Sequence, residues 1–215
     1  IMQVYILKES NSDSRVAASP DTVKKMKDWG LNVVIQDNAG LNSNFSNEEY
    51  IKSGASISNE ITDISKSDLI LKINKPNDDE IALMNEGSVV IASLDPYNNS
   101  ETLNKLKDKG VTSFAMELMP RITRAQSMDI LSSQSNLAGY KAVIDATYLF
   151  NKAMPMMMTA AGTIAPAKVM VFGAGVAGLQ AIATAKRLGA IVSATDVRMA
   201  AKEQVESLGG KFVMV

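Results

Sequence analysis

The first 116 residues alternate short apolar runs with stretches that carry hydrophobic residues at helical spacing. The apolar runs are rich in Val and Ile and are bounded by Gly, Pro and Asn, which is typical of buried strands. We expect strands at 2–7, 32–36, 69–73, 88–92 and 112–116, and helices at 20–29, 47–53, 78–85 and 100–109. Ser19 and Ser100 are predicted to cap their helices, with Pro20 at the first helical position. This alternation predicts a parallel three-layer α/β domain.

The pattern changes after this region. The polar segment 119–129 does not continue the alternation, and a long helix is expected from 129 to 153. This helix carries a stripe of small residues that would let another backbone approach closely: Ser135, Ala138, Gly139, Ala142 and Ala146. We therefore predict two Rossmann-like parallel-sheet domains joined by the long helix, with residues 1–135 in the first and 136–215 in the second.

The segment after the long helix leads into the second domain. The methionines at 156–158 are expected to fill irregular gaps in a core, as methionine clusters usually do, and 159–166 is expected to be a linker. Strands are then predicted at 168–172, 191–195 and 211–215. A doubly wound nucleotide domain has about six strands, so we expect the second domain to be incomplete in this chain.

A glycine-rich turn lies between the strand at 168–172 and a helix that ends before Gly189. Its spacing, with an acid at the end of the next strand, is typical of dinucleotide binding. Gly173 would permit the tight turn, Gly175 would let a pyrophosphate approach the backbone, and Gly178 would let the helix pack close to the sheet. The predicted cofactor-binding residues are Gly173, Ala174, Gly175, Val176, Ala177, Gly178, Asp196, Val197 and Arg198.

Asp196 ends the second strand of this unit, where a carboxylate can accept both hydroxyls of an adenine ribose. A 2′-phosphate at that place would meet a negative charge, so the site should favour NAD(H) over NADP(H). Arg198 leaves an alternative open, because its guanidinium could neutralise Asp196 or reach a phosphate.

Composition narrows the chemistry. The net charge is −1, which gives no indication of binding to nucleic acid or to an anionic membrane surface. The chain has no cysteine and no histidine, so thiolate catalysis, cysteine metal sites and a histidine base are excluded. No uninterrupted apolar run reaches the length of a transmembrane helix, and we predict no metal site.

Three segments carry a resemblance to a known family: 120–129, 132–140 and 156–162. Together with the glycine turn and 203–212, they resemble the NAD(H)-binding component of proton-translocating nicotinamide nucleotide transhydrogenase. The segments at 8–9, 15–18 and 69–72 are similar both to this component and to alanine dehydrogenase, its relative in fold. The resemblance covers essentially the whole chain.

The resemblance implies site residues in the polar segment. In that family the matching loop lies beside the nicotinamide, and its functional residues fall here on Arg121, Gln126, Asp129 and Ser132. Gln126 and Asp129 would hold the carboxamide and the ring, and Arg121 would lie against the dihydronicotinamide or its ribose. A surface ion pair of Arg121 with Asp129 or Glu117 is the structural alternative.

The resemblance also implies an activity and partners. The chain would be an oxidoreductase component, a proton-translocating (Re/Si-type) NAD(P)⁺ transhydrogenase, that passes hydride between NADH and NADP⁺. NADP(H) would be bound on a partner component, and a transmembrane component would couple the reaction to proton movement. A homodimer is expected, peripheral on the cytoplasmic face of a bacterial inner membrane or on the mitochondrial matrix side.

Two other functions remain as alternatives. One is a dehydrogenase acting on a small amino acid, as in alanine dehydrogenase, and the other is a non-enzymatic NAD-sensing module. Alanine dehydrogenases carry a lysine and a histidine where this chain has Asn74 and Asp95. Amino-acid oxidation needs a positioned acid–base group, and Lys72 or Lys75 could in principle substitute here. The role of Arg15, whose counterpart in the dehydrogenases binds a substrate carboxylate, is left open.

Overall fold

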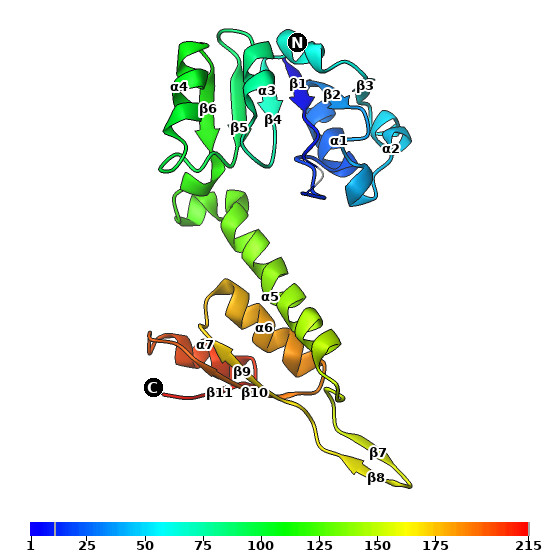
Figure 1. Cartoon of the computed structure of the whole chain (residues 1–215), viewed down its shortest axis with the longest axis vertical. Coiled ribbons are helices and arrows are strands. Elements are labelled where there is room, and N and C mark those ends of the chain that lie inside the picture. Colours follow the sequence, from blue (N-terminus) through cyan, green and yellow to red (C-terminus); the bar gives the residue numbers. More distant parts are fainter. Residues whose placement is uncertain (11, 215) are drawn as a thin grey trace. The chain divides into compact units, whose positions relative to one another are not determined.

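The computed structural model describes residues 1–10 and 12–214. The chain divides into two compact units, Ile1–Met128 and Asp129–Val215. The division falls at the start of the long helix, whereas the sequence pattern placed the domain boundary at residue 135. Figure 1 shows the elements of both units.

The N-terminal unit is built on a six-stranded parallel sheet in the order β3-β2-β1-β4-β5-β6 (Figure 1). The strands are β1 (Gln3–Ile6), β2 (Asn32–Gln36), β3 (Ser56–Ser58), β4 (Leu69–Leu71), β5 (Val89–Ala92) and β6 (Thr112–Ala115). β3 was not predicted, because a single isoleucine between two serines gives no strand signal. The chain leaves β1 in opposite directions along the sheet, so β1 and β4 flank the point where the strand order reverses.

Four α-helices connect these strands. They are α1 (Pro20–Asp28), α2 (Asn47–Lys52), α3 (Asp78–Leu83) and α4 (Ser100–Asp108), with 3₁₀ turns at η1 (Leu41–Ser43), η2 (Ile61–Lys66), η3 (Met116–Leu118) and η4 (Thr123–Met128). Ser19 caps α1 as predicted, because its side chain accepts a hydrogen bond from the Thr22 amide. The cap predicted at Ser100 is wrong. Ser100 is the first helical residue, and Asn99 precedes it without a side-chain cap, because its side-chain oxygen accepts a hydrogen bond from Lys75 instead.

The alternation of side chains along β1 separates two hydrophobic cores. Val4 and Ile6 belong to a core with residues of α1, α2 and β2. Tyr5 and Leu7 belong to another core with residues of η2, α3 and α4. Successive side chains of a strand point to opposite faces, so this sheet is covered on both faces. The predicted three-layer arrangement is confirmed.

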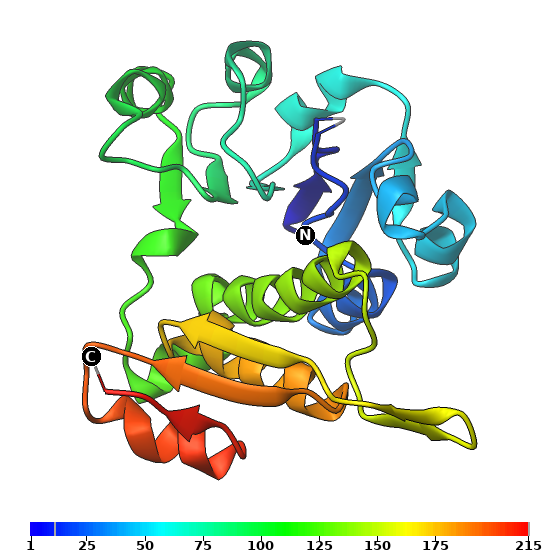
Figure 2. The same cartoon turned by 60° about the horizontal axis from the view of Figure 1, so that its bottom comes forward.

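The C-terminal unit begins with α5 (Ile130–Leu149), capped by Asp129. Its other elements are β7 (Met157–Thr159), β8 (Gly162–Ile164), β9 (Lys168–Phe172), α6 (Val176–Arg187), β10 (Ile191–Thr195), α7 (Ala201–Ser207) and β11 (Lys211–Phe212). The strands β11-β10-β9 form a parallel sheet, with β9 at its edge (Figure 2). Residue 215 of the strand predicted at 211–215 lies outside the described residues.

The predicted packing of the small-residue stripe on α5 holds at Gly139, whereas Ala138, Ala142 and Ala146 are exposed. α5 lies against α6, and a Cβ added to Gly139 would lie 2.1 Å from the carbonyl oxygen of Ala177. Only glycine therefore permits this approach of the two helices. α5 is shorter than predicted and ends at Leu149, because Phe150 takes an extended conformation.

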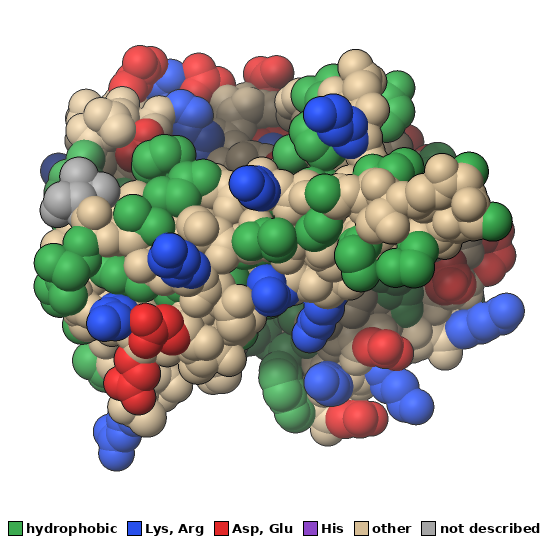
Figure 3. Space-filling model, turned by 90° about the horizontal axis from the view of Figure 1, so that it is seen from below, with side chains coloured by type: hydrophobic (Ala, Val, Ile, Leu, Met, Phe, Trp, Pro, Cys, Tyr) green, Lys and Arg blue, Asp and Glu red, His purple; other side chains and the backbone are tan. Residues whose placement is uncertain are grey.

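Two predictions for the segment after α5 are wrong. The supposed linker contains the antiparallel hairpin β7–β8, and the methionines at 156–158 are exposed instead of filling a core, with Met158 71% exposed. The space-filling view shows hydrophobic side chains at the surface (Figure 3). Among the described residues, no helix has the length and apolar character that crossing a membrane requires.

Candidate nucleotide-binding site

The glycine turn joins β9 to α6 with the geometry that its spacing predicts. Gly173 has a φ of +92°, a conformation that strongly favours glycine, and its amide donates to the Thr195 carbonyl at 2.8 Å. A Cβ added to Gly178 would lie 1.8 Å from the Gly173 carbonyl oxygen. Gly173 and Gly178 are thus required by the turn itself, whatever binds there.

Gly175 differs from Gly178, because among the described residues no atom beyond its two chain neighbours lies within 4 Å of the position that its Cβ would take. It precedes α6, and no side chain caps the N-terminus of that helix. The first N–H groups of a helix have no partner within the helix, and they carry the positive end of its dipole. Open space beside uncapped N–H groups suits a phosphate or pyrophosphate.

Asp196 is held directly against this turn. Its Oδ2 atom accepts a 2.7 Å hydrogen bond from the amide of Ala174, between the first two glycines. The Arg198 guanidinium and amide, followed by the Ala174 amide, hold the pKa of Asp196 well below its usual range. Asp196 therefore stays ionised at neutral pH, with its side chain 6% exposed. Val197 and Arg198 are exposed beside it.

The residues predicted beside the nicotinamide fall in both units. Arg121 and Gln126 are exposed residues of the N-terminal unit, Gln126 within η4. Asp129 and Ser132 begin the C-terminal unit and contact each other, since the Asp129 carboxylate accepts the Ser132 amide at 3.0 Å and its hydroxyl at 2.6 Å. One oxygen of Glu117 accepts the amides of Leu94 and Asp95, and the described residues show no ion pair between Glu117 and Arg121.

The N-terminal unit has a second place where a ligand could be expected, the carboxyl ends of β1 and β4. The chain's own side chains fill it. Buried Glu9 accepts the Ile73 amide at 2.6 Å and the Asn74 side chain at 2.9 Å. Asn74 also donates to Asp13 at 2.8 Å, and Asp13 forms a 2.6 Å ion pair with Arg15. The sequence reasoning missed Glu9 and Asp13, which meet Asn74 only through contacts between distant loops.

The two lysines left open as acid–base candidates are also engaged. Lys72 forms a buried ion pair with Glu80, and its Nζ donates to both carboxylate oxygens at 2.7 and 2.6 Å. Lys75 donates to the Asn99 side chain. Glu80 was missed, although an Asn at 77 followed three residues later by Glu is the signature of the capping box that the structure shows.

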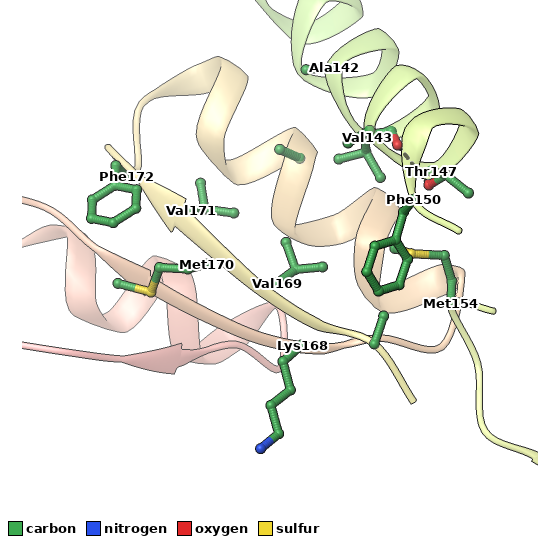
Figure 4. A pocket seen from close by; sticks show the side chains of 13 residues that line it. Ala142, Val143, Thr147, Phe150, Met154, Lys168, Val169, Met170, Val171 and Phe172 are labelled. Atoms are coloured by element: carbon green, nitrogen blue, oxygen red, sulfur yellow. Dashed lines mark hydrogen bonds between the residues drawn. The ribbon is translucent and has the colours of Figure 1, made fainter. Parts of the chain in front are cut away.

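A cavity of about 520 Å³ lies beside β9 in the C-terminal unit. Val169 and Val171 point from β9 toward α6, while Lys168 points away (Figure 4). Phe172, at the end of the same edge strand, is 80% exposed. No convergent polar groups line this space, so it is an uncovered apolar face and we assign it no ligand. Among the described residues, no cluster of acidic side chains could hold a metal ion.

Comparison with known proteins gives the family. Residues 5–138 match the model of the alanine dehydrogenase/PNT N-terminal domain, and residues 142–215 match that of the C-terminal domain. The chain belongs to the alanine dehydrogenase/PNT family. The resemblance read from the sequence and the two-domain Rossmann-like fold are thereby confirmed.

Within the alanine dehydrogenase/PNT family, transhydrogenase components are more similar to the chain than alanine dehydrogenases. It is 52% identical to the first part of NAD(P) transhydrogenase subunit alpha of Rhodospirillum rubrum, over 100% of this chain and 58% of that protein. A crystal structure of transhydrogenase from Sinorhizobium meliloti has a TM-score of 0.95 at 58% identity, over 98% of this chain and 64% of that one. Alanine dehydrogenase of Bacillus subtilis is 30% identical, over 93% of this chain and 53% of that protein. The chain thus spans a little over half the length of these curated relatives.

Proposed function

We propose that the chain is the NAD(H)-binding component of a proton-translocating transhydrogenase, and that it passes hydride between NADH and NADP⁺ held on a partner component. The observation that carries the proposal is the open backbone at Gly175 between uncapped helix N–H groups and ionised Asp196. This arrangement fits a dinucleotide, with the pyrophosphate at the helix and the adenosine ribose at the carboxylate.

The chain's own groups favour hydride exchange over amino-acid oxidation. Oxidising an amino acid requires a group that takes a proton from the substrate, and a guanidinium that binds its carboxylate. In this chain Lys72 forms an ion pair with Glu80, and Arg15 forms an ion pair with Asp13. Exchange between two nicotinamides needs no proton transfer, because the cofactors supply the hydride chemistry and the protein supplies distance and orientation.

Four residues are proposed to orient the nicotinamide: Arg121, Gln126, Asp129 and Ser132. Exposed Arg121 and Gln126 are available to a ligand. Asp129 is fixed by its two hydrogen bonds to Ser132, which gives a carboxylate of defined direction at the start of α5. The rest of the affinity is assigned to the glycine turn and Asp196.

The proposal extends to assembly. The components it requires are an NADP(H)-binding partner and a transmembrane component, which place this chain at the cytoplasmic face of a bacterial membrane or on the mitochondrial matrix side. A homodimer is proposed as well. It is supported by the exposed, uncharged hairpin β7–β8, whose apolar side chains would be covered by a second copy.

Single-turnover hydride transfer tests this function. The complete polypeptide carrying Gln126→Asn is reconstituted with its NADP(H)-binding partner, and transfer from NADH to an NADP⁺ analogue is followed by stopped flow. We expect a rate about a hundredfold lower with nearly unchanged NADH affinity, since a displacement of about 1 Å costs that much. Ser127→Ala, a neighbouring exposed residue, is the control. Weaker binding with an unchanged rate, or oxidation of alanine by this protein alone, would contradict the proposal.

A further inference from the structure

The Asp196 carboxylate has all of its acceptor positions in use. Oδ2 accepts the Ala174 amide at 2.7 Å and Nη2 of Arg198 at 3.2 Å. Oδ1 accepts the Arg198 amide at 2.8 Å and Nε of Arg198 at 3.0 Å. A carboxylate offers about four acceptor sites, so a ribose cannot bind Asp196 unless one of these donors leaves.

The two guanidinium bonds form a fork, with one N–H on each carboxylate oxygen. The two hydroxyls of a ribose would bind in the same way, one on each oxygen. We propose that the Arg198 guanidinium occupies the place of the adenosine ribose and determines specificity, giving way to a ribose diol and pairing with a 2′-phosphate. This inference rests on the proposed function, since it concerns the same nucleotide site.

Arg198 can leave without disturbing Asp196. The Arg198 side chain is 63% exposed, and solvent-exposed ion pairs contribute little to stability. The amides of Ala174 and Arg198 would stay in place, one on each carboxylate oxygen. They keep the carboxylate oriented and hold the Arg198 backbone beside it, so the released guanidinium stays within one side-chain length of the ribose.

The same residue would act differently on the two nucleotides. For NADH, the guanidinium has to move into solvent, leaving Asp196 and the Ala174 carbonyl, to which its Nη2 donates at 3.5 Å. For NADPH, the 2′-phosphate would be repelled by Asp196 but could take over the fork, because arginine binds phosphate with two parallel hydrogen bonds. Arg198 therefore limits the discrimination that Asp196 provides.

Titration of Arg198→Ala with both nucleotides tests this inference in the complete polypeptide. We expect the Kd of NADPH to rise by about tenfold or more, since a charge-assisted pair is lost, and the Kd of NADH to change by less than about threefold. Arg198→Lys keeps the positive charge but loses the pair of parallel N–H donors. Its Kd for NADPH should lie between the values of the wild type and Arg198→Ala. Lys202→Ala removes a charge from the same surface and should leave the ratio of the two constants unchanged.

An unchanged ratio in Arg198→Ala would overturn the inference. Equal weakening of binding for both nucleotides is one form of this outcome, and it would mean that Arg198 is needed to position Asp196 for the ribose. If NADH does not bind the wild-type protein, or binds Gly175→Val equally well, the proposed function fails and the inference fails with it. If NADH binding depends on Gly175 but Arg198→Ala leaves the ratio of the two dissociation constants unchanged, the inference fails and the proposed function stands.

Discussion

The carboxyl ends of the strands differ between the two units. In the N-terminal unit, the place where the strand order reverses is closed by Glu9, Asn74 and Asp13, whose side chains bond to one another and to the backbone. In the C-terminal unit, the corresponding edge is bare backbone at Gly175, with a single carboxylate beside it. Both edges belong to the same type of parallel sheet, but among the described residues the polar side chains at the first edge bond to one another, whereas the backbone at Gly175 is bare.

This difference shows why the fold alone does not identify the candidate nucleotide-binding site. Carboxyl ends of parallel strands are favoured for ligands in either unit. In the N-terminal unit the polar groups bond to one another, and Arg15 forms an ion pair with the carboxylate of Asp13. In the C-terminal unit the helix N–H groups have no side-chain partner. The proposal of a site in the C-terminal unit therefore rests on the chemistry of the edge and not on its topology.

The largest expected effect is on the free energy of unfolding, and it distinguishes a glycine required for packing, Gly178, from the one proposed to bind a ligand, Gly175. Gly178→Val would drive its side chain into the Gly173 carbonyl, and we expect the C-terminal unit to lose about 3 kcal/mol or more of unfolding free energy. Gly175→Val meets open space at a φ of −78°, so a loss of less than about 1 kcal/mol is expected. Urea unfolding followed by circular dichroism measures both. Equal losses would mean that Gly175 is also a packing glycine.

The next effect concerns the closed edge of the N-terminal unit. Lys72→Met leaves the Glu80 carboxylate buried without its partner, and the expected cost is about 3–5 kcal/mol of unfolding free energy. Lys72→Met combined with Glu80→Gln should recover most of this loss, because glutamine keeps the cap of α3 without a charge. NADH affinity should be unchanged in the double variant. A double variant as unstable as the single one would show that the ion pair itself is required.

A smaller effect is expected on affinity at the open edge. Asp196→Ala removes the carboxylate proposed to accept the ribose hydroxyls, each bond to a charged group being worth about 1.5–3 kcal/mol. We expect the wild-type protein to bind NADH at least about tenfold more tightly than NADPH, and the variant to narrow this gap mainly by weakening NADH. Fluorescence titration gives both constants. A gap that survives in Asp196→Ala would exclude this carboxylate as the basis of the preference.

The smallest effect is a pH dependence at the closed edge. Hydrogen bonds from Arg15 hold the pKa of Asp13 well below its usual value. The native state then binds this proton less readily than the unfolded chain. Asp13 therefore contributes stability above the unfolded pKa of about 4, and the contribution is lost as pH falls below it. Asp13→Asn should flatten the acid side of the stability profile, and an unaltered slope between about pH 5 and pH 2 would contradict this.

Much of the fold could be predicted from the sequence, because local patterns carry it. The bounds of β2, β9 and β10 agree with the apolar runs, and the caps and glycines mark the helix ends. The hairpin β7–β8 could not be predicted, since its exposed methionines have the composition of a core segment. Hydrophobicity alone does not tell which apolar residues a fold leaves uncovered.

Some features of the candidate site could also be predicted from the sequence, and others could not. The positions of Gly173, Gly178 and Asp196 follow from spacing, because each glycine has a local steric reason. The fork from Arg198 to Asp196 depends on a side-chain rotamer, and the contact of Glu9 with Asn74 joins loops 65 residues apart. Neither has a periodic signal in the sequence. Only the three-dimensional structure reveals that one edge is closed and the other open.

The central claim is that the dinucleotide binds at the bare backbone of the C-terminal unit. Calorimetric titration of the complete polypeptide with NADH, comparing Gly175→Val with Asn74→Ala, tests it most directly. We predict that Gly175→Val weakens NADH binding by about a hundredfold or more, because its side chain occupies the space of the pyrophosphate, and that Asn74→Ala binds NADH as the wild type does. Undiminished binding by Gly175→Val, or a comparable loss in Asn74→Ala, would contradict the account.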